Sequence, residues 1–153
     1  MTKKILGVVA GYIAMAAFIF LTFTVLYLLL GADGSFEPGS YHVSTTWLVM
    51  SFILGLFAAI LGGCVCVMIT KDKKVALWLA GLVLVLEIVF AFPALGESDE
   101  ERNKVREGEV SNTEAMQNAK QPTLALILNP IIGAIGVIAG SRLKKDSKPE
   151  TAV

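Results

Sequence analysis

Residues 71–96 read KDKKVALWLAGLVLVLEIVFAFPALG and contain the strongest structural signal in the chain. Lysines and an aspartate open the segment, and the apolar run that follows them holds a single ionisable side chain, that of Glu87. An apolar run of this length with almost no charge is typical of a transmembrane helix. Because a carboxyl group inside a membrane is costly, its presence indicates a specific role for Glu87.

Three more apolar runs of comparable length occur in the chain. The predicted spans are therefore about residues 5–30, 47–70, 75–95 and 122–140. Hydrophobic residues make up 55% of the chain and charged residues 17%, and the mean hydropathy is +0.69, which is far from the composition of soluble domains. The sequence predicts an all-α membrane protein in which residues 1–153 form one four-transmembrane-helix bundle, with connecting loops at 31–46 and 96–121 and a tail at 141–153.

Basic residues are divided unequally between the two predicted ends of the bundle. Nine of the thirteen lie in residues 3–4, 71–74 and 142–148, on the side that holds both termini. The loops on the opposite side hold four basic residues and nine acidic ones. Because cytoplasmic loops carry the excess of Lys and Arg, we expect both termini to be cytoplasmic, with the protein in the plasma membrane or, in a bacterium, the inner membrane.

Small residues recur on one face of each predicted span, at spacings of three and four residues. Such a stripe lets the backbones of neighbouring transmembrane helices approach closely. Cys64 and Cys66 stand two residues apart and so cannot share a face, and we expect Cys64 to face lipid and Cys66 to face the bundle. The small residues expected to pack between helices are Gly7, Gly11, Gly55, Gly62, Ala80, Gly133, Gly136 and Gly140.

Glu87 and Asn129 are predicted to form a polar pair inside the membrane. Glu87 lies 13 residues beyond Lys74 and Asn129 lies 13 residues before Arg142, so both are about 20 Å from the basic boundary. A charge at this depth costs about 2.5–3.5 kcal/mol, and protonating a glutamate at pH 7 costs a similar amount, about 3.7 kcal/mol. We therefore expect a neutral carboxyl that is hydrogen-bonded to Asn129 or to a backbone carbonyl that Pro130 leaves free.

The predicted loops carry signals of local structure and no pattern typical of catalysis. Asp33, Glu37 and His42 lie in the first loop, but their spacing matches no set of metal ligands, so we predict no metal site. In the second loop, Ser98 and Ser111 each begin an S-x-x-E motif of the capping-box form, which predicts one or two short helices. We expect the many charges of this loop to form a solvated face.

The sequence contains no nucleophile with its base, cluster of metal ligands or phosphate-binding loop, so we expect no enzymatic activity and no cofactor. The expected partners are the lipid bilayer and either a second copy of the chain or another membrane protein, and not nucleic acid. The layout resembles that of claudin-like tetraspan proteins, whose first outer loop carries a Trp and a cysteine pair. Residues 31–46 contain no cysteine, so no family is assigned. Residues 150–153, Glu-Thr-Ala-Val, resemble a ligand of PDZ domains.

Two functions fit these features. We favour a non-enzymatic accessory or scaffolding protein that acts through helix–helix contacts, in which Glu87 and Asn129 join two helices by a hydrogen bond. The alternative is a proton- or cation-coupled small transporter or channel subunit that uses Glu87 as its coupling group. The lack of any other ionisable residue inside the predicted spans is the reason for preferring the first function.

Overall fold

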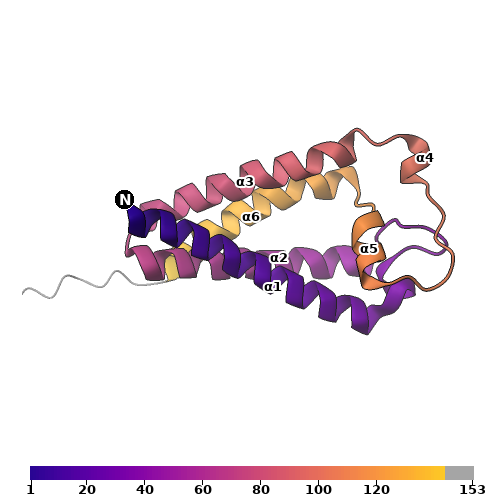
Figure 1. Ribbon diagram of the computed structural model, residues 1–153, viewed down its shortest axis with the longest axis horizontal. Helices are drawn as coiled ribbons and strands as arrows, with labels where there is room; N and C mark the ends of the chain where they lie inside the picture. The colour runs from indigo at the N-terminus through magenta and orange to yellow at the C-terminus, as the bar shows by residue number, and fades with distance from the viewer. Residues whose placement is uncertain (144–153) are drawn as a thin grey trace, which may run out of the picture.

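The computed structural model describes residues 1–143, and its four long helices form one bundle (Figure 1). Helices α1, α2, α3 and α6 are each long and apolar enough to cross a membrane. The chain is therefore an all-α, multi-pass membrane protein, as the sequence predicts. The PDZ-ligand-like residues 150–153 lie outside the described part of the chain. The helix bounds are Thr2–Ser35 (α1), Thr45–Thr70 (α2), Lys73–Leu95 (α3), Asp99–Arg102 (α4), Asn112–Asn118 (α5) and Thr123–Leu143 (α6).

The first helix is longer than its predicted span. It continues to Ser35, so the first part of the predicted loop 31–46 is helical. Gly31 bends the helix at that point with φ 65 and ψ −176, backbone angles that suit glycine alone. The next helix begins where the Ser44 side chain accepts a hydrogen bond from the Trp47 N–H at 3.1 Å. Gly31 thus bends α1, and the helix continues beyond this bend to Ser35.

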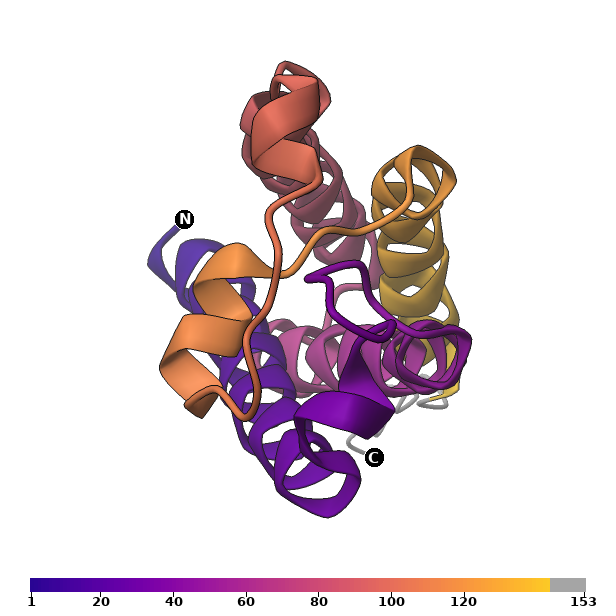
Figure 2. The ribbon, with the colours of Figure 1, turned by 90° about the vertical axis from the view of Figure 1, so that its right-hand side faces the viewer.

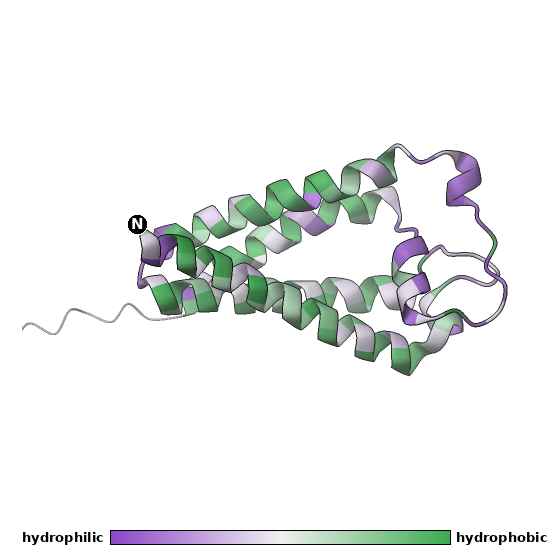
Figure 3. Ribbon diagram, viewed as in Figure 1, coloured by the Kyte–Doolittle hydropathy of each residue, from purple (hydrophilic) through white to green (hydrophobic). Residues whose placement is uncertain are grey.

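Hydrophobic residues cover the four long helices, and hydrophilic residues gather at the two ends of the bundle (Figure 3). We call the end that holds residues 1–4 and 71–74 the lysine-rich end. We call residues 36–44 and 96–122, at the opposite end, the cap. At the lysine-rich end, Lys4 Nζ lies 3.1 Å from Asp72 Oδ2, and this hydrogen bond holds the pKa of the aspartate below its usual value.

Helices α2 and α6 meet backbone to backbone. Gly140 of α6 lies against the carbonyl group of Ile60, and Gly63 of α2 lies against the carbonyl group of Val137. The Cys64 thiol donates to the carbonyl oxygen of Gly140 at 3.1 Å. A β-carbon at either glycine would collide with backbone atoms of the other helix, so this close contact requires glycine at both positions.

Most of the predicted packing residues lie where we expect them. Ala80 is 5% exposed. The prediction that Gly55 packs against another helix is wrong, because a β-carbon there would meet no atom within 4 Å. The prediction that Cys64 faces lipid is also wrong, because its side chain faces α6. The sequence pattern also missed Gly63. The predicted glycines that do lie against a neighbouring helix are Gly7, Gly11, Gly62, Gly133, Gly136 and Gly140.

The helices converge at the lysine-rich end and separate toward the cap. Figure 1 shows the pair α1 and α2 diverging from the pair α3 and α6, and Figure 2 shows α1 and α3 on opposite sides of the bundle at the cap. The main hydrophobic core includes Cys66, Val75 and Leu79, all buried near the lysine-rich end. Close packing is thus concentrated in one half of the bundle.

The cap is a folded unit and not only a solvated charged face. Backbone hydrogen bonds join its two segments, from the Arg106 N–H to the Gly39 oxygen and from the Val43 N–H to the Lys120 oxygen, each at 3.1 Å. A second apolar cluster anchors these segments to α1. Its buried members are Tyr27, Ala32, Phe36, Tyr41, Val43 and Ala115.

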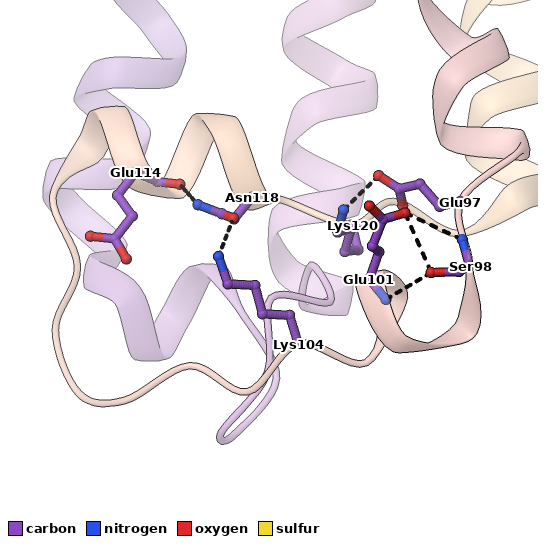
Figure 4. Close-up of polar contacts among 7 residues, drawn as sticks. All are labelled: Glu97, Ser98, Glu101, Lys104, Glu114, Asn118 and Lys120. Atoms are coloured by element: carbon purple, nitrogen blue, oxygen red, sulfur yellow. Dashed lines mark hydrogen bonds and ion pairs between the residues drawn. The ribbon is translucent and has the colours of Figure 1, made fainter.

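Both S-x-x-E motifs begin short helices, as predicted. The Ser98 hydroxyl accepts from the Glu101 N–H at 3.3 Å, and the Glu101 carboxylate accepts from the Ser98 N–H at 3.4 Å, which completes a capping box for α4 (Figure 4). The Ser111 hydroxyl accepts from the Glu114 N–H at 3.2 Å. The Glu114 carboxylate instead accepts from the Tyr41 hydroxyl at 2.8 Å, and this bond raises the pKa of the tyrosine above its usual value.

Arg106 is a buried cation within the cap. Its side chain is 3% exposed, and its Nη2 lies 2.7 Å from the Asp33 carboxylate. The guanidinium also donates to the Gly108 carbonyl and lies 5.9 Å from the centroid of the Phe36 ring. Nothing in the local sequence distinguishes Arg106 from the other charges of its loop, because Asp33 and Phe36 come from a distant segment.

Candidate intramembrane site

A cavity of about 270 Å³ lies between the four long helices, in the half of the bundle near the cap. Its walls are mainly apolar, and a few polar side chains are placed among them. This combination is typical of sites for small ligands. Each long helix contributes to the lining, for example Phe23 of α1, Phe52 of α2, Phe90 of α3 and Leu126 of α6.

Glu87 is the only ionisable residue among the described residues that line this cavity. It lies on the inward face of α3, toward α6, as predicted. Gly133 of α6 leaves room for the carboxyl, because a β-carbon at Gly133 would lie 3.0 Å from Glu87 Oε1. Glu87 Oε2 is buried and has no hydrogen-bond partner in the described part of the chain. Since buried polar atoms are almost always paired, this oxygen is an exception that needs an explanation.

Asn129 lines the same cavity but does not bind Glu87. Its Nδ2 donates to Gln121 Oε1 at 3.1 Å, so the predicted hydrogen bond between Glu87 and Asn129 is wrong. The predicted depth and inward faces of the two residues do bring them to one cavity. Pro130 has no N–H, so the carbonyl of Leu126, which belongs to another lining residue, loses its usual helical donor.

Gln121 connects this cavity to a smaller one beside the cap. The smaller cavity has a volume of about 110 Å³, and Gln121 and Leu126 line both. Charged side chains from the cap, Glu97, Arg102 and Lys120, line the smaller cavity. Sequence reasoning missed Gln121 because it stands just before the fourth apolar run, where a polar residue is typical of a loop.

An ion pair forms part of the wall of the smaller cavity. Lys120 Nζ lies 2.6 Å from Glu97 Oε1, and the two side chains are only 14% and 23% exposed (Figure 4). Gln121 therefore lies between the ion pair of Glu97 and Lys120 in the smaller cavity and the polar residues Asn129 and Glu87 in the larger one.

The geometry suits the binding of a proton or of a positively charged group at Glu87. Its carboxyl is inward-facing, one oxygen is unpaired, and the surrounding lining supplies no cation. Within residues 1–143, no group of three or more His, Cys, Asp or Glu side chains is placed to hold a metal ion. Comparison with protein-family models, curated proteins and solved structures finds no similar protein, so the function is inferred from the residues of the site.

Proposed function

We propose that this multi-pass membrane protein is a non-enzymatic, proton- or cation-coupled transporter or channel subunit, with Glu87 as the coupling group. The observation that supports the proposal is the buried Glu87 Oε2, which has no hydrogen-bond partner within residues 1–143 and belongs to a residue that lines a cavity. An ionisable group inside a membrane is rare and is typical of ion and substrate pathways.

A purely structural role for Glu87 explains this geometry less well. A residue that joins helices by a hydrogen bond gains about 0.6–2 kcal/mol only when the bond is made. Glu87 Oε2 makes no such bond within the described residues, and the Asn129 amide that lines the same cavity is bonded to Gln121. Leaving a buried acceptor unpaired costs about 1–3 kcal/mol. A ligand that interacts with the Glu87 carboxyl would offset this cost when it binds.

We also propose that the lysine-rich end is cytoplasmic and that the cap faces outward, across the plasma membrane. The excess of basic residues at the lysine-rich end supports this orientation. The smaller cavity and Gln121 then lie on the outer side of Glu87. Exchange between the site and the outside would pass the ion pair of Glu97 and Lys120.

The orientation predicts which cysteines react with a thiol reagent that cannot cross membranes. A cysteine replacing Glu107, an exposed cap residue, should be labelled in intact cells, and one replacing Thr2 should be labelled only after the cells are opened. The unsubstituted chain measures the background from Cys64 and Cys66, which lie inside a membrane-spanning helix. Labelling of the Thr2 site in intact cells would reverse the proposed orientation.

Coupling through Glu87 predicts that two different substitutions have the same effect. Glu87→Gln and Glu87→Leu should both reduce pH-driven flux in proteoliposomes to the level of empty vesicles, because neither side chain can release a proton. The flux is measured with a pH-sensitive dye inside the vesicles after a step in external pH. Glu107→Gln removes an exposed carboxylate of the cap and should leave the flux unchanged.

The folded cap favours a second candidate function, that of an accessory or scaffolding protein that binds another membrane protein. Its two segments are held together by long-range hydrogen bonds and so present a defined polar surface. This function predicts the opposite result for Glu87→Gln, because an amide preserves helix packing. A Gln variant that folds and retains all activity would exclude coupling through Glu87 and favour the accessory role.

A further inference from the structure

We infer that the cavity at Glu87 takes a small organic cation, an ammonium group that carries an apolar body. This inference rests on the proposed function, because it names the chemical class of the cation that binds at Glu87. Three properties of the cavity support it, namely the charge of its lining, the character of its walls and its size.

The charge of the lining favours a cation. When Glu87 is deprotonated, the cavity carries one negative charge, and the described lining residues of α1, α2 and α6 contribute no titratable group. The charged residues of the adjoining smaller cavity are Glu97, Lys120 and Arg102, and the first two are paired with each other. A cationic group would therefore supply the opposite charge that the Glu87 carboxylate lacks among the described residues that line the cavity.

The walls favour an organic cation over a metal ion. Metal cations such as Ca²⁺ require about six to eight oxygen ligands. The polar side chains of the lining, those of Ser51, Glu87, Gln121 and Asn129, supply fewer oxygen atoms than that. One of these oxygens, Gln121 Oε1, already accepts a hydrogen bond from Asn129 Nδ2 at 3.1 Å.

Aromatic rings form another part of the lining. Phe23 of α1 and Phe52 of α2 are partly buried. Phe90 of α3, one turn beyond Glu87, also lines the cavity but is 71% exposed. Aromatic faces attract ammonium groups and also pack against apolar bodies. A bare proton would need neither the aromatic walls nor the space between them.

The size of the cavity limits the ligand to about one ring with a small head group. Its volume of about 270 Å³ lies just below the range of about 300–1,000 Å³ that is usual for drug-sized ligands. Gly55 of α2 is one of the lining residues, and a β-carbon there would meet no atom within 4 Å. A larger side chain at Gly55 can thus occupy ligand space without a clash between helices.

The test uses the purified full chain in lipid nanodiscs and two probes of the same shape. Benzyltrimethylammonium carries a permanent positive charge, and neopentylbenzene replaces its nitrogen with carbon. We expect calorimetric titration to show binding of the cation and much weaker binding of the neutral probe. Glu87→Gln should weaken binding of the cation about 30-fold or more, because it removes the charge that pairs with the ligand.

Two glycine variants separate occupation of the cavity from damage to the fold. Gly55→Leu should fold normally and abolish binding of the cation by filling the cavity. Gly81→Leu is the matched control, because Gly81 also has open space around it but lies on an exposed face of α3. Lowering the pH should weaken binding of the cation to the natural chain, since a proton and the cation compete for one carboxylate. Glu87→Gln should show no such pH dependence.

Two results would overturn the inference, and they are distinguishable from failure of the proposed function. Equal binding of both probes, unchanged by Glu87→Gln, would show a plain apolar pocket. Glu87-dependent flux without binding of benzyltrimethylammonium would show that the ligand class is wrong, while the coupling role of Glu87 stands. Absence of pH-driven flux together with tight, Glu87-dependent binding of the cation would support the ligand class and exclude proton coupling.

Discussion

Gly140→Leu is expected to destabilise the bundle by about 3 kcal/mol, at the upper end of the usual cost of overpacking. The added β-carbon would meet the backbone oxygen of Ile60, and backbone atoms cannot move aside as a flexible side chain can. The two helices would have to separate, and the hydrogen bond from the Cys64 thiol to the Gly140 oxygen would be lost. The free energy of unfolding is measured by titration with a denaturing detergent, monitored by circular dichroism.

Gly55→Leu provides the matched control for this measurement. It makes the same chemical change on a transmembrane helix, at a position where a β-carbon meets no neighbouring atom within 4 Å. Its unfolding free energy should stay within about 0.5 kcal/mol of the natural chain. If Gly140→Leu unfolds as the control does, then α2 and α6 are not in backbone contact in the membrane.

The fold could be predicted from the sequence because a membrane span has a strong local signal. Length, apolar composition and charged boundaries identify each of the four helices, and all of these features are contiguous in the chain. The small-residue stripes succeeded for α1 and α6, whose predicted glycines all lie against neighbouring helices. They failed in part for α2, because this helix packs against α1 through Gly62 and against α6 through Gly63. One stripe describes only one face.

Gly55 shows a second limit of pattern reasoning. It continues the stripe of Gly62 toward the cap, but the helices diverge in that half of the bundle. The same periodicity therefore places one glycine in a helix contact and the other at a cavity. Divergence depends on how whole helices cross, and residue spacing along one helix does not encode it.

The candidate site was predictable in its depth and not in its hydrogen bonds. Counting residues from the basic boundaries correctly brings Glu87 and Asn129 to one cavity. The hydrogen-bond partner of the Asn129 amide depends on which acceptors lie nearby in the folded protein. That partner is Gln121, which lies outside the predicted span. The fold of the cap could not be predicted for a similar reason, because residues 36–44 form backbone hydrogen bonds with residues more than sixty positions away in the sequence.

Arg106→Met is expected to open the cap and leave the transmembrane bundle intact. The substitution keeps much of the apolar stem but removes the ion pair to Asp33, the hydrogen bond to the Gly108 carbonyl and the contact with the Phe36 ring. Breaking a buried ion pair typically costs about 3–5 kcal/mol. The Asp33 side chain is 84% exposed, so water can solvate the carboxylate left behind, and we expect a smaller local loss of about 2 kcal/mol.

Hydrogen exchange measures this loss in the cap and in the membrane helices at the same time. Amides such as those of Val43 and Lys120, which bond across the two cap segments, should exchange about 30-fold faster in Arg106→Met, while α2 and α6 keep their protection. Asp33→Asn is the matched control, because it removes the charge from the exposed partner and leaves Arg106 in place.

If the cap amides exchange equally fast in both variants, the ion pair between Arg106 and Asp33 stabilises the cap. If only Arg106→Met exchanges faster, the buried packing and hydrogen bond of the guanidinium stabilise the cap, as the 3% exposure of the Arg106 side chain indicates. Unchanged exchange in both variants would mean that the backbone bonds between the segments hold the cap without Arg106.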